Sequence, residues 1–435
     1  MKIAILGFAG QGQSSFEYWN KPENQITICD RDESLEVPEG TTAQLGTDYL
    51  NNLDQFDLLI RTPALHPKNI MTANANNSQI LDKVWSNTNE FFKVCPTKNI
   101  IGVTGTKGKG TTSTLITKML EAAGNRVHLG GNIGIPPLEL LKNDIQPDDW
   151  VVLELANFQL TDIKSSPHIA VCLMVEPEHM DWHEDMEEYI AAKQQLFINQ
   201  TEADIAIYYA NNENSLSIAD ASVGRLIPYM EQPGAVVAGE AISIDGQEIC
   251  KTSELKLLGK HNWQNACAAV TAVWQITQNT EAVRAVLISF TGLEHRLELV
   301  RTLGNVSYYD DSFGTTPETA IVAIEAFSQP KIVILGGSDK GATYEKLAEA
   351  VKDGDVRKAI LIGDTAPAIG QALQSAGYHD VIDGGRTMTE IVAVAQSAAK
   401  SGDVILLSTG CASFGLFKNY KDRGEQFKKA VLELS

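Results

Sequence analysis

The sequence has no long apolar run. Across its 435 residues, no hydrophobic stretch approaches the ~20 residues that a membrane-spanning helix requires. Residues 1–9 are apolar enough to resemble the start of a signal peptide, but the stretch is too short and leads directly into Gly10-Gln11-Gly12. We therefore interpret it as a buried first strand, and we expect a cytoplasmic protein without a membrane partner.

Cysteine is scarce and follows no pattern. No two cysteines form a Cys-x-x-Cys motif, so the sequence predicts neither a zinc site nor a disulfide framework, and it fits a reducing compartment. The cysteines are Cys29, Cys95, Cys172, Cys250, Cys267 and Cys411.

Basic residues are also few. The chain has 35 Lys and Arg against 55 Asp and Glu, a formal net charge of −20. Because a broad nucleic-acid-binding surface needs the opposite balance, we expect no nucleic-acid partner. A small anionic ligand remains compatible with this charge, since a few local cations can outweigh the mean field. We also expect a monomer.

What the sequence does have is strand–helix alternation in three successive segments, residues 1–92, 93–296 and 297–435. This alternation predicts an α/β fold with mainly parallel sheets. The expected strands are residues 2–6, 25–29, 56–60, 100–104, 150–153, 170–175, 205–209, 306–309, 331–335, 358–362 and 404–407, and the clearest helices are residues 113–123, 186–199 and 263–277.

The first segment carries a glycine-rich turn after its first strand. Gly7, Gly10 and Gly12 follow that strand, and Asp30 ends the next one. In a doubly wound sheet these positions lie beyond the carboxyl ends of the strands, where ligands bind. The alternatives are a dinucleotide site or a tight strand-to-helix turn without a ligand.

A phosphate-binding loop is the most specific signal. Residues 102–112 read Gly-Val-Thr-Gly-Thr-Lys-Gly-Lys-Gly-Thr-Thr between a predicted strand and a predicted helix. Glycines let backbone N–H groups turn toward phosphate oxygens, and Lys109 would neutralise them. Gly110 stands where Ser or Thr is usual, so Thr111, and then Thr112, is the expected magnesium ligand. The alternative is a glycine-rich turn with exposed lysines.

Three further side chains could complete a metal site beside this loop. Glu154 ends one predicted strand, and His179 follows another. Mg²⁺ prefers oxygen ligands, so the histidine is unexpected in that role. Taken alone, Glu154 would be a capping or salt-bridge group, His179 a polar loop residue and Lys193 a solvated helix residue. Asn132 follows two glycines, where turns also use asparagine.

Together these motifs resemble the Mur ligase family, in order and over essentially the whole chain. The matching blocks are Gly105-Thr-Lys-Gly-Lys-Gly-Thr-Thr112, Gly130-Gly-Asn-Ile-Gly134, Glu154-Leu-Ala-Asn-Phe-Gln159, Glu178-His-Met-Asp181, Tyr189-Ile-Ala-Ala-Lys193, His261-Asn262, His295-Arg296, Asp311-Ser312, Gly336-Gly-Ser-Asp-Lys340 and Cys411-Ala-Ser-Phe-Gly-Leu-Phe-Lys-Asn-Tyr420. The second and last blocks are typical of the branch that adds D-glutamate to UDP-N-acetylmuramoyl-L-alanine in peptidoglycan synthesis.

The resemblance implies three domains: a Rossmann-like UDP-sugar-binding domain, a central ATP-binding domain of the P-loop type and a Rossmann-like amino-acid-binding domain. It implies ATP and two Mg²⁺ ions as cofactors, with Thr111, Glu154, His179 and a carbamylated Lys193 as metal ligands. It assigns the nucleotide to residues 105–112 (Gly105, Thr106, Lys107, Gly108, Lys109, Gly110, Thr111, Thr112) and to Asn262, Arg296 and Asp311. It assigns the UDP sugar and the acceptor end to Gly7, Gly10, Gln11, Asp30, Asn132 and Gln159, and D-glutamate to Thr315, Lys340, Ser413, Phe414 and Tyr420.

The chain departs from the family pattern at three places. Gly110 replaces a hydroxyl residue, Ala156-Asn157 replaces a Ser-Ser pair, and Phe313 stands where lysine is common. Gly-Lys-Gly is also found in folylpolyglutamate synthases, but that class lacks a glycine-rich domain before the ATP loop. A nicotinamide-dependent oxidoreductase would leave the second loop unexplained. A non-catalytic protein that binds a UDP sugar remains an alternative that only an activity assay can test.

Overall fold

The computed structural model describes residues 1–132, 134–257, 259, 261–339, 342–413 and 415–434. It contains two compact units, Met1–Leu255 with Lys260–Phe290, and Lys256–Gly259 with Thr291–Ser435. Within the described residues the strands form four sheets, and no helix is both long and apolar enough to cross a membrane. The predicted α/β architecture with mainly parallel sheets is confirmed.

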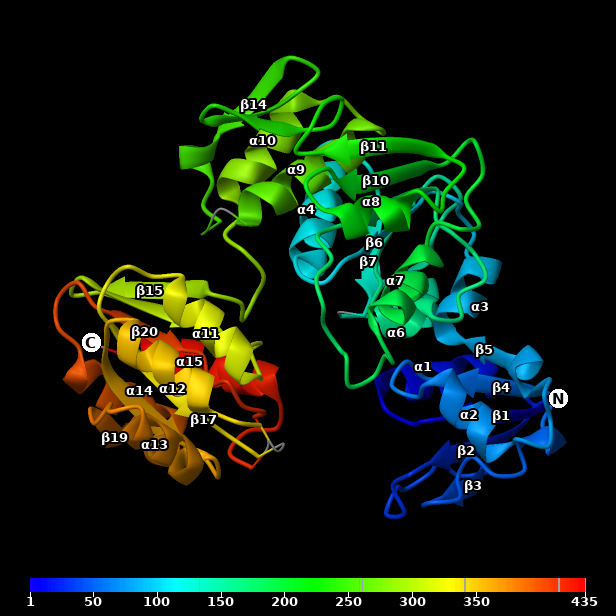
Figure 1. Ribbon diagram of the computed structural model, residues 1–435, viewed down its shortest axis with the longest axis horizontal. Helices are drawn as coiled ribbons and strands as arrows, with labels where there is room; N and C mark the ends of the chain where they lie inside the picture. Colours follow the sequence, from blue (N-terminus) through cyan, green and yellow to red (C-terminus); the bar gives the residue numbers. More distant parts are fainter. Residues whose placement is uncertain (133, 258, 260, 340–341, 414, 435) are drawn as a thin grey trace. The chain divides into compact units, whose positions relative to one another are not determined.

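The first segment is a parallel sheet in the order β3-β2-β1-β4-β5, drawn in blue in Figure 1. Alternate residues of β1 face opposite sides, so that Ile3 and Ile5 pack under α1 and α3 while Ala4 and Leu6 pack under α2. The elements are β1 (Lys2–Leu6), α1 (Gly10–Trp19), β2 (Gln25–Asp30), β3 (Thr42–Leu45), η1 (Leu53–Gln55), β4 (Leu58–Arg61), α2 (Pro67–Ala73), η2 (Ile80–Lys83), β5 (Val84–Ser86) and α3 (Asn87–Val94).

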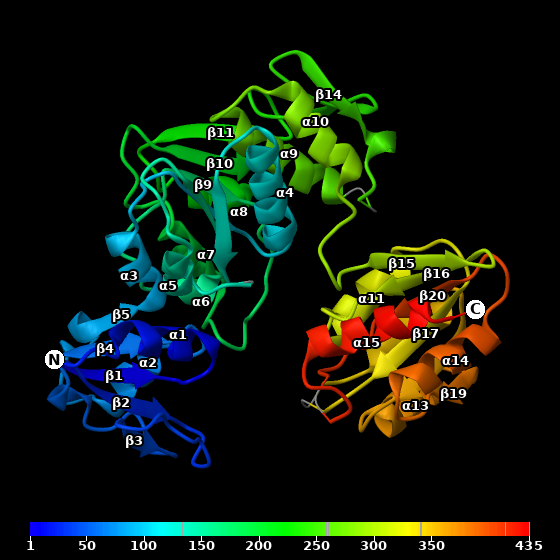
Figure 2. The same ribbon diagram turned by 180° about the vertical axis from the view of Figure 1, so that it is seen from behind.

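The central segment is a second parallel sheet, in the order β11-β10-β9-β6-β8-β7. Helices α4 and α9 lie against each other on one face and α7 and α8 on the other (Figures 1 and 2). Its elements are β6 (Ile100–Thr104), α4 (Lys109–Ala122), β7 (Val127–Gly131), α5 (Pro137–Leu140), η3 (Leu141–Asn143), β8 (Trp150–Glu154), α6 (Asn157–Leu160), β9 (Ile169–Cys172), α7 (Met186–Gln194), β10 (Ile205–Tyr209), α8 (Glu213–Ala219), β11 (Arg225–Tyr229), α9 (His261–Trp274) and α10 (Thr280–Ser289).

A small antiparallel sheet follows β11 and was not predicted. It consists of β12 (Val236–Ala238), β13 (Ala241–Ile244) and β14 (Gln247–Lys251), after which η4 (Thr252–Glu254) leads toward α9. The strands are only three to five residues long, and for that reason periodicity alone did not reveal them.

The first and central segments share one apolar core. Ile5 of β1 and Phe91 of α3 belong to the same buried cluster as Leu138 of α5 and Leu153 of β8. This continuity explains why the two segments form a single compact unit. The predicted domain boundary near residue 92 stays a prediction.

The second unit is a mixed sheet in the order β15-β16-β20-β17-β18-β19, with β15 antiparallel and the other strands parallel. Val333 and Leu335 of β17 pack under α11–α13, and Ile332 and Ile334 pack under α14 and α15. The elements are β15 (Glu298–Leu303), β16 (Val306–Asp310), α11 (Pro317–Glu325), β17 (Lys331–Gly336), α12 (Glu345–Asp353), β18 (Val356–Ile362), α13 (Ala366–Ser375), β19 (Val381–Asp383), α14 (Met388–Ala398), β20 (Val404–Leu407) and α15 (Tyr420–Leu432).

The predicted element types hold, but several ends differ. Helix α4 begins at Lys109, not at residue 113, because the glycine and threonines after the loop already form its first turn. Strand β9 ends at Cys172, not at residue 175, and α7 ends at Gln194, not at residue 199.

Candidate active site

Three neighbouring strands of the central sheet end at one edge. Register pairs Val103 of β6 with Glu154 of β8, and Thr104 of β6 with Cys172 of β9. The carboxyl edge of a parallel sheet is where ligands bind. At this edge Glu154 ends β8, beside the start of the phosphate loop and the start of the segment that leads to His179.

The loop between β6 and α4 has the backbone that a phosphate site requires. Gly105 and Gly108 have φ values of 143° and 86°. A Cβ at Gly105 would lie 2.6 Å from the Leu173 Cβ, and one at Gly108 would lie 2.2 Å from the Asn265 Oδ1. Lys109 Nζ donates to the carbonyl oxygens of Gly105 and Thr106, each at 2.9 Å. The Lys109 ammonium is thus held inside the loop. The N-terminus of α4 at the same place carries partial positive charge, so both groups favour binding of an anion.

Hydroxyl groups line the first turn of α4. Thr111, Thr112 and Ser113 are buried, and among the described residues the hydroxyls of Thr112 and Ser113 have no hydrogen-bond partner. Buried polar atoms without partners are unusual in native proteins. Oxygen atoms of this kind fit a magnesium-bound phosphate, and the loop around them fits the phosphate itself. Gly110, which stands where a hydroxyl residue is usual, contributes no side chain to this turn.

Glu154 lies beside the predicted substrate residue Asn132. Its side chain is buried, and its Oε1 accepts a hydrogen bond from Asn132 Nδ2 at 3.1 Å. Gln159 is buried in α6, where its Oε1 accepts from the Ala156 amide at 3.0 Å. The Gln159 Nε2 has no hydrogen-bond partner in the described part of the chain. The three predicted side chains thus belong to the same end of β8.

Lys193 is fully buried in α7, which is an unusual position for a lysine. Its Nζ donates to the Gly105 carbonyl at 3.1 Å and lies 4.4 Å from the centre of the Tyr189 ring. Burial, assisted by the charge of Lys109, lowers the pKa of Lys193 to about 7. A neutral amine at ordinary pH is the form that reacts with CO₂, so the site fits a carbamate. The sequence-based alternative of a solvated helical lysine is wrong.

His179 lies in the segment between β9 and α7 with a left-handed φ of 59°. Its ring is half-buried against Phe158, with centroids 4.7 Å apart. Burial lowers its pKa, and the positive charges of Lys109 and Lys193 act in the same direction, while Glu178 opposes them. A neutral imidazole is the form that binds a metal.

Two residues of this site were missed. Asn265 of α9 packs on Gly108, and its Nδ2 donates to the predicted nucleotide residue Asn262 at 2.9 Å. Tyr189 Oη lies 3.1 Å from Thr106 Oγ1, which ties α7 to the loop. The spacing of Asn262 and Asn265, one helical turn apart, was the available signal for the first. Lys107, predicted to bind nucleotide, is exposed.

In the first segment, the residues predicted to bind the UDP sugar lie together. Gly7 has a φ of 97°, and a Cβ at Gly12 would lie 2.1 Å from the Gly7 oxygen, so neither position has room for a side chain. Asp30 Oδ2 accepts from the Phe8 amide at 2.7 Å. Gly10 and Gln11 begin α1 beside it. Their role in binding a UDP sugar stays a prediction.

In the second unit, one buried arginine joins the segments that carry three predicted residues, Asp311, Ser413 and Tyr420. Arg423 donates to Ser312 Oγ at 2.8 Å and to the Cys411 carbonyl at 3.1 Å. Ser312 Oγ in turn donates to the Tyr420 carbonyl at 2.8 Å. The segments of Asp311, Ser413 and Tyr420 are therefore fastened together. Arg423 was missed, since an arginine in a polar helix has no distinctive sequence signal.

Asp311 is buried, with Oδ2 accepting from the Ser408 hydroxyl at 2.6 Å, and burial raises its pKa to about 7. Phe313, the departure from lysine, lies 4.4 Å from the Arg296 guanidinium carbon, a cation–π contact. Thr315 follows on the same loop. Lys340 and Phe414, both predicted for D-glutamate, lie outside the described residues.

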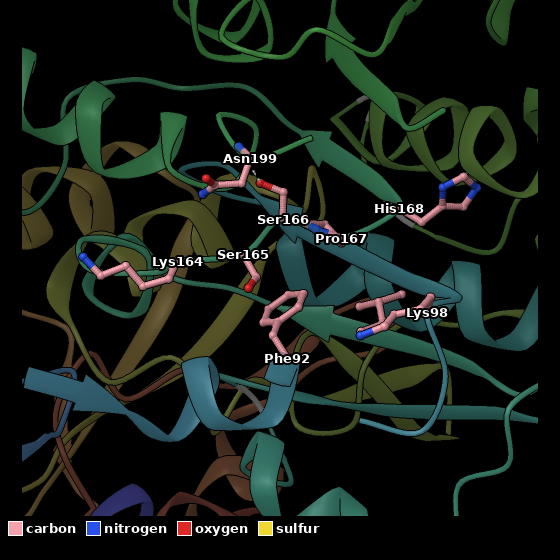
Figure 3. A pocket seen from close by; sticks show the side chains of 9 residues that line it. Phe92, Lys98, Lys164, Ser165, Ser166, Pro167, His168 and Asn199 are labelled. Carbon is pink, nitrogen blue, oxygen red and sulfur yellow. Dashed lines mark hydrogen bonds between the residues drawn. The ribbon is translucent and has the colours of Figure 1, made fainter. Parts of the chain in front are cut away.

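A separate cavity of about 270 Å³ lies at the opposite edge of the central sheet, where β6 and β9 begin. Phe92, Lys98 and Lys164 line it together with His168, and none of the predicted site residues does. The side chains of Lys164 and His168 point away from each other (Figure 3), so these two side chains do not converge on one ligand.

Comparison with known sequences gives two family matches. Residues 103–273 match the Mur ligase middle domain, and residues 295–411 match the Mur ligase glutamate ligase domain. The UDP-N-acetylmuramoylalanine–D-glutamate ligase of Clostridium tetani is 34% identical, covering 100% of this chain and 97% of that protein. The ligase of the same name from Symbiobacterium thermophilum is 36% identical, covering 100% and 98%.

Solved structures share the fold at low identity. UDP-N-acetylmuramate–alanine ligase of Thermotoga maritima has a TM-score of 0.60 at 17% identity over 99% of both chains. MurF ligase of Thermotoga maritima in complex with ADP has a TM-score of 0.59 at 16% identity, over 99% of this chain and 94% of that one. Folylpolyglutamate synthase of Mycobacterium tuberculosis has a TM-score of 0.55 at 13% identity and covers only 77% of this chain.

Proposed function

This chain belongs to the Mur ligase family, and from that premise we propose that it joins D-glutamate to UDP-N-acetylmuramoyl-L-alanine at the expense of ATP. The reaction belongs to cytoplasmic peptidoglycan precursor synthesis. The observation that carries the proposal is the meeting, at one sheet edge, of the phosphate loop with Glu154 and the buried Lys193, in a chain related over its full length to D-glutamate ligases.

We assign residues 1–92 to the UDP sugar, 93–296 to ATP and 297–435 to the amino acid. Gly7, Gly10, Gln11 and Asp30 hold the UDP portion. Asn132 and Gln159 orient the alanyl carboxylate. Thr315 and Ser413, with Lys340, Phe414 and Tyr420, hold D-glutamate, while Asn262, Arg296 and Asp311 contact the nucleotide.

The chemistry has two steps. The alanyl carboxylate attacks the γ-phosphorus of ATP, so that ADP leaves and an acyl phosphate forms. The amine of D-glutamate then attacks the acyl carbon, and phosphate leaves with the amide bond in place. Because the first step joins two anions, electrostatic stabilisation has to dominate. Lys109 and the loop amides supply it, and no covalent nucleophile from the protein is needed.

The residues at this edge fit a divalent cation. Thr111, Glu154 and His179, with Lys193 as a carbamate, would hold Mg²⁺, which when bound neutralises charge on the phosphates. Carbamylation would turn the Lys193 amine into an anionic oxygen donor, which gives a reason for a lysine to be buried beside Lys109.

An assay of phosphate release tests the reaction directly. We expect release with UDP-N-acetylmuramoyl-L-alanine, Mg²⁺-ATP and D-glutamate, and much less with L-glutamate or with other D- and L-amino acids. Preference for another amino acid would place the chain elsewhere in the family. Binding of the UDP sugar without phosphate release from any amino acid would favour a non-catalytic protein.

Lys109→Ala should lower turnover by at least ~100-fold, since a charge aimed at the transferred phosphate is removed. The fold should persist, because the Lys109 ammonium donates to the Gly105 and Thr106 carbonyls, which belong to its own loop. Phosphate release and thermal unfolding are measured on the same sample. Retained turnover in the folded variant would contradict the loop assignment.

A further inference from the structure

The segment that carries His179 has no secondary structure of its own. Between β9 and α7, residues 173–179 are irregular and residues 180–185 form turns and bends, and His179 has a φ of 59°. A left-handed backbone at a residue other than glycine costs roughly 1–3 kcal/mol and persists only when its surroundings hold it. Whatever fixes this segment therefore also fixes the position of His179.

The carboxylate of Glu188 collects N–H groups from this segment and from the first segment of the chain. Its Oε2 accepts from the Glu184 amide at 2.7 Å. Its Oε1 lies 3.1 Å from His66 Nε2. Since His66 Nδ1 accepts from the Lys68 amide at 3.0 Å, the neutral ring carries its proton on Nε2 and donates to Glu188.

A second histidine faces the same carboxylate. His183 is buried, and its Nε2 lies 2.7 Å from Asn157 Nδ2. Because the amide nitrogen can only donate, His183 Nε2 accepts and its Nδ1 carries the proton. That Nδ1 lies 3.5 Å from Glu188 Oε2, near the carboxylate but not hydrogen-bonded to it. Asn157 is one of the departures from the family pattern and begins α6, two residues before the predicted substrate residue Gln159.

Aromatic packing closes the same junction. The Trp182 ring lies 4.1 Å from the His66 ring and 4.9 Å from the Phe158 ring. The Trp182 indole N–H donates to the Ala64 carbonyl at 3.3 Å. Two side chains that follow His179 in the sequence, Trp182 and Glu188, are thus anchored to residues 64–66 of the first segment.

We propose that Glu188 is a positioning residue whose clamp, formed with His66, Asn157, Trp182 and His183, holds the His179 segment in its metal-binding geometry. The inference rests on the proposed function, because the geometry matters for Mg²⁺-ATP. It means that the UDP-sugar-binding segment holds the metal-binding loop in place, through His66 and the Ala64 carbonyl. The D-glutamate residues belong to the other unit and do not take part.

Glu188→Gln and His66→Ala test the clamp, with Glu184→Gln as the matched control. A glutamine at position 188 has only one side-chain oxygen, so it cannot accept one hydrogen bond from His66 and another from the Glu184 amide on two separate oxygens. The Glu184 side chain pairs with the exposed Lys68, so the control removes a charge from the same loop and keeps the amide that Glu188 binds. Hydrogen exchange of residues 177–185 is measured on the whole chain with MgCl₂ and ADP. Phosphate release is measured while the concentration of Mg²⁺ or of D-glutamate is varied.

We expect both clamp variants to speed exchange in this segment and to raise the half-activating Mg²⁺ concentration by roughly tenfold, as for the outer partners of metal ligands. The KM for D-glutamate should stay within about twofold, and the control should match the wild type. Unchanged exchange, equal effects of the control, or an equal rise in the KM for D-glutamate would overturn the clamp. Exchange is independent of turnover, so an inactive wild type with the expected exchange pattern would count against the proposed function alone.

Discussion

At the scale of single residues, buried ionisable groups differ by what faces them. Lys193 and Lys331 are both buried, and burial lowers the pKa of each. The Lys193 amine bonds the phosphate loop, whereas the Lys331 amine donates to the Gly354 carbonyl just after α12. The first therefore lies at the phosphate loop, where we propose that it takes part in the reaction, and the second caps a helix end.

Lys193→Ala should inactivate the enzyme, with partial rescue by acetate, since a small carboxylate can supply the missing anionic oxygen. Lys331→Ala is the matched control, because it removes a buried lysine of the other unit. We expect the control to lose stability but not turnover, and to show no response to acetate. Phosphate release is measured with and without acetate. Activation of both variants by acetate would contradict a specific role for Lys193.

Asp311 should make the chain less stable as pH rises. Its pKa in the folded chain is about 7, above the ~3.9 of an unfolded aspartate. Its contribution is therefore fully present below about pH 4 and is lost as pH rises toward 7. We expect Asp311→Asn, which stays neutral, to gain thermal stability over the wild type at pH 8 and little at pH 4.

Asp403 is the control, because its pKa is shifted in the opposite direction. Burial opposes ionisation there, but hydrogen bonds from the Arg357 side chain and the Lys400 amide lower its pKa overall. Its stabilising effect is present above the unfolded pKa and is lost as pH falls, so Asp403→Asn should cost stability at pH 8. The melting temperature is recorded from pH 4 to 8, and parallel behaviour of the two variants would contradict the assigned pKa directions.

At the scale of elements, the loop before α4 needs a glycine at Gly108 for its shape more than the turn after α4 needs one at Gly124. Gly108→Ala should raise the KM for ATP by roughly tenfold or more, since the left-handed φ is strained and the new Cβ would meet Asn265. Gly124→Ala shares the left-handed φ but meets no atom within 4 Å. It should lose some stability and keep its KM. Equal KM values for both variants would contradict the steric argument.

The sequence predicted what depends on neighbours along the chain. Strand β6 and the glycine loop were recognised because apolar residues, glycines and Lys109 follow one another within a short span. Glu188 and Arg423 were not recognised, because each acts through contacts with elements far away in sequence. Local patterns carry no information on such contacts.

At the scale of the whole molecule, Arg61 fastens the first segment to the central one. It is buried, and its guanidinium donates to both oxygens of Asp162, each at 2.7 Å. Arg61→Ala should destabilise Met1–Leu255 with Lys260–Phe290 by roughly 2–4 kcal/mol, because the Asp162 carboxylate, whose side chain is only 15% exposed, loses its partner. All six tryptophans lie in this unit, so their fluorescence in urea reports its unfolding.

Lys142→Ala is the matched control. Lys142 of η3 pairs with Glu17 of α1 and so joins the same two segments, but the two side chains are 59% and 58% exposed. Exposed pairs contribute at most about 1 kcal/mol. Similar losses from the two substitutions would contradict the distinction between buried and exposed pairs. The monomeric state stays a prediction at this scale.

The core shared by the first and central segments limits how relatives can recombine. A crossover near residue 92 would join two halves of one apolar cluster that have drifted separately, and each mismatch in volume costs roughly 1–3 kcal/mol. A crossover near residue 291 leaves that cluster intact, and the described clusters of the second unit contain only residues after Arg296. Chimaeras built to accept a different amino acid should therefore inherit the first 290 residues from a single parent.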